Sequence, residues 1–294
     1  MRRFFAHLGV IMVLVVTAVT VAGASSSAST TARAAATMHR DALPVAPDQA
    51  TVILYGDSLA SEAQGSFRDA LAGAGVGNVR TSTFGGTAIC DWLDRMRSDA
   101  AALHPTAVVV EFSGNALTPC MMDDQGQSLA VAVNAYYRKY SNDAREVLRI
   151  FEASGTRVYF AGAPKTRVAE ETNDLNAGLL NTVYADLAAE TPDAARFVGA
   201  GSALLHDGHW TETLPCLASE PCTGGVDTTG RGINVVRAPD GGHFCPGAPG
   251  ATRGVTGTCP VWSSGAFRYG NAMAAAVLRD LGAGDAAAVS VAVS

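Results

Sequence analysis

The chain has few charged side chains, and lysine is nearly absent. Its 294 residues include two lysines, Lys139 and Lys165, and charged residues make up 16% of the sequence. Acidic residues outnumber basic ones by 27 to 21. A nucleic-acid-binding surface needs clustered Lys and Arg side chains that neutralise phosphates. No such cluster occurs in the sequence, which argues against a nucleic-acid partner.

One long uncharged apolar stretch, residues 8–22, lies near the N-terminus. It follows Arg2 and Arg3 and ends at Ala22-Gly23-Ala24, a small-residue cleavage site. This layout predicts a secretory signal peptide over residues 1–24, and therefore a location outside the cell or in the cell envelope. The alternative is an uncleaved N-terminal membrane anchor, because the stretch is close to the ~18 residues that span a bilayer.

The rest of the chain shows no internal repeat and no second linker. Residues 25–48 are poor in large apolar side chains and predict a flexible linker. Residues 49–284 are apolar enough to form one domain with a sizeable core, and residues 285–294 form a C-terminal tail. We expect a monomer.

C-x-x-C motifs are absent, although the chain has six cysteines. An even number of cysteines in an exported chain predicts disulfides in preference to a metal site. Proximity in sequence favours the pairs Cys216–Cys222 and Cys245–Cys259, which leaves Cys90–Cys120. His206 and His209 could bind a metal, but two histidines in a glycine-containing loop are a weak basis for one. We therefore predict neither a metal nor a cofactor.

Short apolar runs alternate with longer segments of helical spacing. The runs, rich in β-branched residues, predict strands over Thr51–Tyr55, Val79–Phe84, Ala107–Phe112 and Arg157–Ala161, with a weaker fifth over Ala195–Val198. The predicted helices are Ser58–Ala74, Asp91–Leu103, Ser128–Ala153, Asn173–Glu190 and Ser264–Leu281. This alternation is typical of an α/β fold with a central parallel sheet between two helical layers. Residues 201–236 interrupt the pattern and predict a long irregular insertion.

Residues suited to acyl-transfer chemistry follow the predicted strands. Gly56-Asp57-Ser58, Gly85-Gly86-Thr87 and Ser113-Gly114-Asn115 each come directly after a strand, and Asp240-Gly241-Gly242-His243 precedes the last helix. Ligands of parallel α/β sheets bind outside the carboxyl ends of the strands. Together these segments offer a nucleophile, donors for an oxyanion, and a base with a carboxylate that orients it.

Over residues 50–245 the chain resembles the SGNH, or GDSL, hydrolase superfamily. The four signature residues occur in the expected order: Ser58 in the first block, Gly85 or Gly86 in the second, Asn115 in the third and His243 in the fourth. The resemblance implies a flavodoxin-like three-layer fold and a serine ester hydrolase that needs no cofactor.

The same resemblance implies a role for each signature residue. Ser58 attacks the acyl carbon, His243 takes its proton and Asp240 holds the imidazole. The N–H groups of Ser58 and Gly85 and the side-chain amide of Asn115 bind the oxyanion; Gly86 is the alternative to Gly85. Asp57 is expected to be structural and to accept backbone hydrogen bonds in the turn.

The third block departs from the common G-x-N-D, because Ala116 follows Asn115. This variant is more similar to SGNH domains that occur with integral-membrane acyltransferases of cell-surface glycans. We therefore expect an acyl ester on a small molecule, a cell-surface glycan or a lipid as substrate.

Three alternatives remain open at the level of sequence. An O-acyltransferase uses the same triad, with a sugar hydroxyl in place of water. A non-catalytic glycan-binding protein retains the fold but needs a broken triad position, and none is broken here. An α/β-hydrolase requires G-x-S-x-G in the middle of the sheet. That pentapeptide is absent, and Ser58 follows the first strand instead.

Overall fold

The computed structural model describes most of the predicted domain, and all described residues lie in one compact unit, 41–294. The described residues are 43, 45–174, 176, 178–245 and 262–283. The predicted signal peptide, 1–24, and C-terminal tail, 285–294, lie outside the described residues, as does most of the predicted linker.

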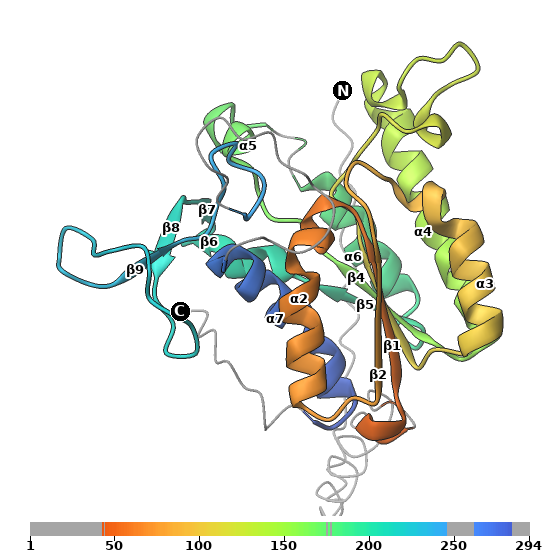
Figure 1. Cartoon of the computed structure of the whole chain (residues 1–294). Coiled ribbons are helices and arrows are strands. Elements are labelled where there is room, and N and C mark those ends of the chain that lie inside the picture. Colours follow the sequence, from red (N-terminus) through yellow and green to blue (C-terminus); the bar gives the residue numbers. More distant parts are fainter. Residues whose placement is uncertain (1–42, 44, 175, 177, 246–261, 284–294) are drawn as a thin grey trace, which may run out of the picture. The chain divides into compact units, whose positions relative to one another are not determined.

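A five-stranded parallel sheet forms the centre of the fold (Figure 1). Its strands are β1 (Thr51–Gly56), β2 (Asn78–Thr83), β3 (Ala107–Glu111), β4 (Arg157–Ala161) and β5 (Ala195–Val198). They are ordered β2-β1-β3-β4-β5, and every neighbouring pair is parallel. This is the flavodoxin-like order. The inner strands β3 and β4 are buried along their whole length, which explains why their sequences are continuous apolar runs.

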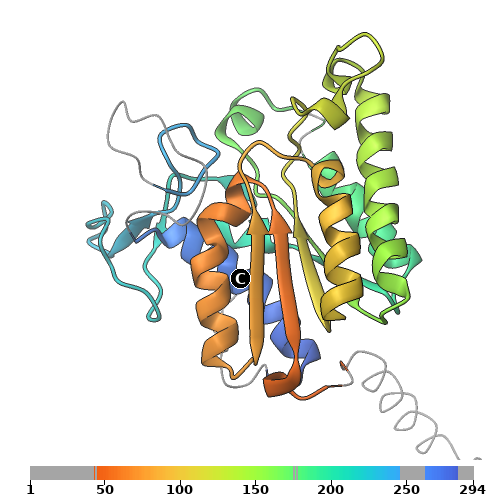
Figure 2. The ribbon, with the colours of Figure 1, turned by 45° about the vertical axis from the view of Figure 1, so that its right-hand side comes forward.

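Helices cover both faces of the sheet (Figure 2). The helices are α2 (Ser58–Gly73), α3 (Leu93–Leu103), α4 (Val133–Glu152), α6 (Leu179–Glu190) and α7 (Ser264–Asp280). Val52 and Leu54 of β1 share a core with α2 and α7, while Ile53 and Tyr55 share a second core with α3, α4 and α6. Successive side chains of a strand point to opposite faces. The predicted three-layer α/β/α architecture is thus confirmed.

Three predicted helices begin later than expected, α3 by two residues, α4 by five and α6 by six. The 3₁₀ turn η4 (Leu129–Val131) occupies the start of the segment predicted as one helix from Ser128. The other short helical elements are η1 (Pro47–Gln49), η2 (Ile89–Trp92), η3 (Pro119–Met121), α5 (Arg167–Glu171) and η5 (Ala200–Leu204).

The insertion over residues 201–236 is more regular than predicted. It contains two small antiparallel sheets, β6 (Leu205–His206) with β7 (His209–Trp210), and β8 (Thr213–Pro215) with β9 (Ile233–Val235). Asp207 and Gly208 both have positive φ, of 50° and 78°, which makes the tight turn between β6 and β7 possible. Strands of two or three residues are too short to leave a periodic pattern in the sequence.

Two of the three predicted disulfides are confirmed. Cys90–Cys120 joins the segments that follow β2 and β3, and Cys216–Cys222 closes a loop within the insertion. Cys259 of the predicted pair Cys245–Cys259 lies outside the described residues. Disulfides are typical of proteins in oxidising compartments. In the part of the chain that the structure describes, no helix has both the length and the apolar character needed to cross a membrane.

Candidate active site

Ser58 lies in a tight turn between β1 and α2, where it is the first residue of the helix and 7% exposed. Asp57 caps the helix, because its Oδ1 accepts a hydrogen bond from the Leu59 N–H at 3.0 Å. The turn also requires glycine at position 56: a Cβ there would lie 2.5 Å from the Glu111 carbonyl oxygen and 2.3 Å from the Ala60 Cβ. Steric crowding thus explains the glycine of the Gly-Asp-Ser tripeptide, and the helix cap explains its aspartate.

His243 connects Ser58 with Asp240 through both ring nitrogens. Its Nε2 lies 2.9 Å from Ser58 Oγ, and its Nδ1 lies 2.7 Å from Asp240 Oδ2. The backbone N–H groups of Gly242 and His243 donate to Asp240 Oδ1, each at 3.1 Å. Burial alone raises the pKa of Asp240, but these hydrogen bonds outweigh it and hold the pKa below its ordinary value. Asp240 is therefore ionised at neutral pH and keeps the Nδ1 proton of the imidazole directed toward itself.

Glu62 fastens the segment that follows His243 to the helix that begins at Ser58. Its Oε2 accepts hydrogen bonds from the backbone N–H groups of Phe244, at 2.6 Å, and Cys245, at 3.3 Å. Ser58 and Glu62 are four residues apart and therefore lie on the same side of α2. Sequence reasoning missed Glu62. The signal in the sequence was an acidic residue four positions after Ser58, among the apolar residues of the predicted helix; in the structure it is 5% exposed.

Arg237 supports the loop that carries His243 from its buried side. The side chain is 1% exposed, and it donates to the carbonyl oxygens of Lys165 at 3.1 Å and Gly242 at 3.4 Å. Its guanidinium also lies over the Phe244 ring, 5.6 Å from the centroid. Burial lowers its pKa to about 10, so it stays charged at neutral pH.

Trp210, at the end of β7, holds the same loop from the insertion. Its Nε1–H donates to the Gly241 carbonyl oxygen at 2.9 Å, two residues before His243. The Arg167 N–H donates to the same oxygen at 3.0 Å, and the Arg167 guanidinium lies 5.9 Å from the centroid of the Trp210 ring. The insertion therefore contributes to the placement of His243 without contacting it.

Replacing Trp210 by phenylalanine should lower kcat while the fold is retained. An aromatic ring remains at the position, but the Gly241 carbonyl oxygen loses one of its two donors, and a small displacement of His243 is costly. We expect about a 10-fold loss in kcat, measured with a chromogenic ester. The matched control is Trp262→Phe, because Trp262 lies outside the loop and is 39% exposed. Equal kcat values for the two variants would show that the Trp210 hydrogen bond does not place the base.

Asn115 lies beside the site, but both hydrogens of its amide are engaged. Nδ2 donates to Asp57 Oδ2 at 2.9 Å and to the Thr87 carbonyl oxygen at 3.2 Å. In contrast, no described residue accepts a hydrogen bond from the backbone N–H of Ser58, Gly85 or Gly86. These three backbone N–H groups therefore have no hydrogen-bond acceptor among the described residues, and this observation does not choose between Gly85 and Gly86.

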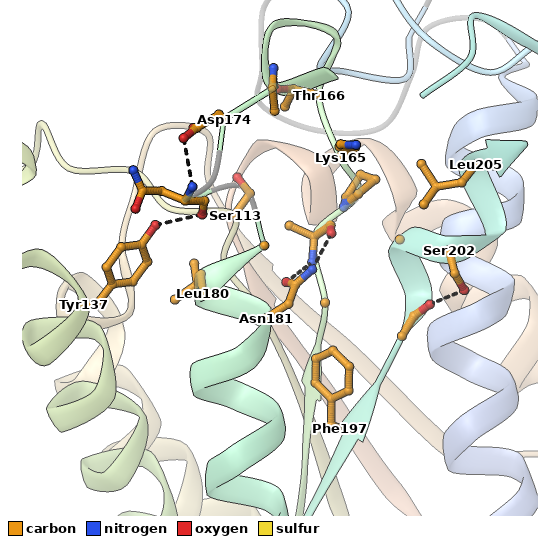
Figure 3. A pocket seen from close by; sticks show the side chains of 18 of the residues that line it. Ser113, Tyr137, Lys165, Thr166, Asp174, Leu180, Asn181, Phe197, Ser202 and Leu205 are labelled. Atoms are coloured by element: carbon orange, nitrogen blue, oxygen red, sulfur yellow. Dashed lines mark hydrogen bonds between the residues drawn. The ribbon is translucent and has the colours of Figure 1, made fainter. Parts of the chain in front are cut away.

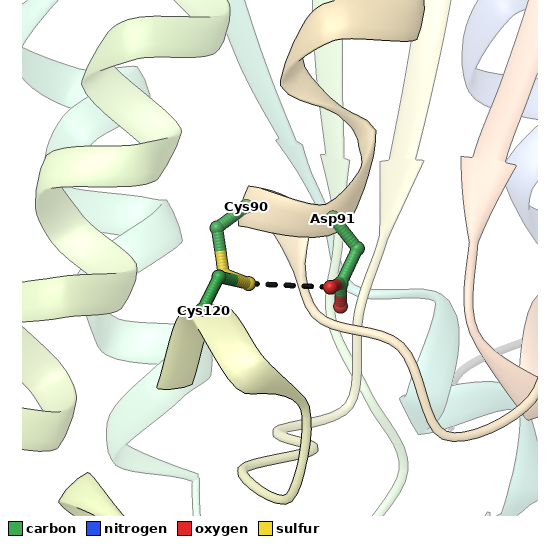
Figure 4. A group of neighbouring side chains, drawn as sticks. All are labelled: Cys90, Asp91 and Cys120. Atoms are coloured by element: carbon green, nitrogen blue, oxygen red, sulfur yellow. Dashed lines mark hydrogen bonds between the residues drawn. A yellow bond between two sulfur atoms is a disulfide. The ribbon is translucent and has the colours of Figure 1, made fainter. Parts of the chain in front are cut away.

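Neither candidate metal cluster has a suitable donor set. Cys90, Asp91 and Cys120 lie together, but the two sulfurs are bonded to each other and Asp91 contacts Cys120 Sγ at 3.3 Å (Figure 4). A disulfide sulfur is not a thiolate and does not serve as a metal ligand. His209 Nδ1 lies 2.8 Å from Glu170 Oε1. No group of three ligand side chains that includes His206 or His209 occurs among the described residues.

A pocket of about 520 Å³ opens at the carboxyl ends of β3, β4 and β5 (Figure 3). Its apolar walls include Tyr136, Leu180, Phe197 and Leu205. Most polar lining groups bond to the protein itself: Asn181 exchanges two hydrogen bonds with Ala163, and Lys165 pairs with Glu170 at 2.6 Å. The pocket therefore offers a mainly apolar surface.

The lining of the pocket includes a residue of the segment after β3 and a residue that contacts the loop of His243. Ser113, two residues before Asn115, lines one side. Thr166 lines another side and lies against the loop of the base, since a Cβ on Gly242 would be 3.9 Å from its methyl carbon.

Comparison with known proteins places the chain in a family. The family described as "Protein of unknown function (DUF459)" matches residues 51–247, a span that includes Ser58, Asn115, Asp240 and His243. The chain belongs to the DUF459 family. No curated protein matches it.

Solved structures of similar fold include esterases. A GDSL-like lipase from Bacteroides thetaiotaomicron is 13% identical, with a TM-score of 0.45, over 85% of this chain and 96% of that one. A catalytic mutant of an acetylxylan esterase from Geobacillus stearothermophilus is 14% identical, with a TM-score of 0.46, over 81% of this chain and 96% of that one.

Proposed function

We propose that this DUF459 protein is a serine esterase that cleaves acyl esters through an acyl-enzyme intermediate. The observation that carries the proposal is the continuous set of hydrogen-bonding contacts from Ser58 Oγ through both nitrogens of His243 to Asp240. A serine hydroxyl is a weak nucleophile unless a base takes its proton, and an ionised carboxylate stabilises the imidazolium that results.

The reaction follows from this arrangement in two steps. Ser58 Oγ bonds to the acyl carbon as its proton moves to His243 Nε2, and the carbonyl oxygen becomes an oxyanion. The imidazolium then gives the proton to the leaving alcohol as the ester C–O bond breaks. Water then bonds to the acyl carbon as His243 takes its proton. The Ser58 Oγ–acyl bond breaks, the imidazolium returns the proton to Oγ, and the acid is released.

Backbone donors support the oxyanion in this proposal. The Ser58 N–H lies at the N-terminus of α2, where the helix dipole favours negative charge, and Gly85 or Gly86 supplies a second donor. The Asn115 amide contributes when its bond to the Thr87 carbonyl, the longer of its two, is exchanged for one to the substrate. Catalytic hydrogen bonds of a free enzyme commonly rearrange in this way when substrate binds.

The apolar pocket suggests which part of the substrate the enzyme holds. A cavity of about 520 Å³ is larger than an acetyl group needs, and it is within the usual range for small-molecule sites. We place the acyl chain of an exported, cell-surface or small-molecule ester in it. Export rests on the N-terminal sequence, and the two disulfides support it.

A panel of p-nitrophenyl esters from acetate to palmitate tests this function. We expect turnover, with kcat/KM rising from acetate to esters of intermediate chain length as the acyl group fills the pocket. Addition of a sugar or simple alcohol distinguishes the O-acyltransferase alternative, in which acyl transfer outcompetes hydrolysis. Absence of turnover for every ester, with and without an alcohol acceptor, would contradict the proposed function.

A further inference from the structure

Two acidic side chains are buried together beneath the nucleophile. Asp57 and Glu111 are both 0% exposed, and Glu111 ends β3 directly opposite Gly56 of β1. Glu111 Oε2 accepts a hydrogen bond from the Ala60 N–H at 3.0 Å, and its Oε1 accepts one from the Tyr269 hydroxyl at 3.0 Å. The Glu111 carboxyl is therefore bonded to the first turn of the helix that begins at Ser58.

Asp57 is held as an acceptor on every side. In addition to the Leu59 N–H, its carboxylate accepts hydrogen bonds from the Ser113 N–H and Oγ, each at 2.7 Å, and from Asn115 Nδ2 at 2.9 Å. The Asp57 and Glu111 carboxyl groups are close enough for a hydrogen bond between them. A hydrogen bond between two carboxyl groups requires a proton on one of them. Asp57 accepts from four donor groups and Glu111 from two, so the negative charge is better stabilised on Asp57 and the proton belongs to Glu111.

The surroundings of the pair also favour a neutral Glu111. Burial raises its pKa well above the ordinary value, and the charge of Asp57 raises it further. The neighbouring titratable groups are tyrosines from three helices, and the guanidinium of Arg237 faces one of them, Tyr269. The tyrosines are Tyr136, Tyr140, Tyr184 and Tyr269. Among the described residues, no Lys, Arg or His bonds to either carboxyl, so two negative charges here would be uncompensated.

We propose that Asp57 and Glu111 share one proton, and that neutral Glu111 is a positioning residue for the active site. It acts through Asp57 on Asn115 and through the Ala60 N–H on the helix turn that carries Ser58. Its role in catalysis rests on the proposed esterase function, whereas the proton on Glu111 is independent of that function.

The shared proton predicts that ester turnover falls at alkaline pH. When Glu111 ionises, its charge repels Asp57 and disturbs the groups that both carboxyls hold. The free energy of unfolding should also decrease as the pH rises. A group whose pKa is raised by folding contributes stability below its unfolded pKa, about 4.3 for glutamate, and loses it as pH rises toward the folded value. Glu111→Gln cannot ionise and should remove both effects.

Infrared difference spectroscopy tests the proton directly and without any substrate. At pH 7 we expect a carbonyl band of a neutral carboxylic acid in the wild-type protein, absent from Glu111→Gln. The control Glu152→Gln alters an exposed glutamate at the end of α4 and should leave the band unchanged. A wild-type spectrum without that band, or a band that persists in Glu111→Gln, would overturn the assignment of the proton.

Kinetics test the positioning role. Because glutamine remains neutral, Glu111→Gln should retain the wild-type kcat at pH 7 and should not show the decline in kcat at alkaline pH. Glu111→Ala should lower kcat about 100-fold, because the reacting groups are misplaced. An alkaline decline that persists in Glu111→Gln, or equal losses in the two variants, would contradict it. A Glu111→Gln chain that does not fold would also contradict the positioning role, because an uncharged side chain at this position is expected to be enough for folding.

Discussion

Ser58→Ala is expected to reduce ester turnover by on the order of 10³-fold or more, because no acyl-enzyme forms without the hydroxyl. The measurement is kcat/KM with the best p-nitrophenyl ester. The control Ser98→Ala removes an exposed hydroxyl from α3 and should leave turnover unchanged. Retention of a tenth of wild-type turnover would show that Ser58 is not the nucleophile.

The same substitution should leave the fold intact. Asp57 caps α2 through its own carboxylate, and the Ser58 hydroxyl contributes one contact, to His243. A single hydrogen bond near the surface contributes about 1 kcal/mol to the free energy of unfolding. Thermal unfolding of Ser58→Ala should therefore remain close to wild type, which separates a catalytic loss from an unfolded protein.

His243→Ala should cost about as much as Ser58→Ala, since members of a triad act as a unit. Without the imidazole, no group accepts the serine proton and none returns it to the leaving alcohol. The control is His206→Ala, a histidine whose side chain is 66% exposed, and it should retain wild-type turnover. A large loss in His206→Ala, restored by a divalent cation, would favour the metal alternative. Near-wild-type turnover in His243→Ala would remove the histidine from the mechanism.

The strands were the most predictable elements. The apolar runs of β4 and β5 match the structure residue for residue, and those of β1, β2 and β3 differ by one residue at one or both ends. Buried parallel strands need apolar side chains on both faces, so their sequences stand out. The small sheets of the insertion were missed because their stability comes from turns, a disulfide and contacts with the domain.

The central residues of the site were predictable because they follow strands or precede the last helix. The residues that hold them were not. Glu62, Trp210 and Glu111 act on segments 30 to more than 180 residues away, and a single sequence contains no record of those contacts. The engagement of the Asn115 amide by Asp57 and Thr87 likewise depends on the packing of three loops.

Labelling with a fluorophosphonate, followed by peptide mass spectrometry, tests most directly whether His243 activates Ser58. The reagent bonds covalently to a serine whose proton a nearby base removes. The account predicts one adduct, on the peptide that contains Ser58, absent in Ser58→Ala and greatly slowed in His243→Ala. An adduct on another serine, or labelling of Ser58 that is equally fast without His243, would contradict it.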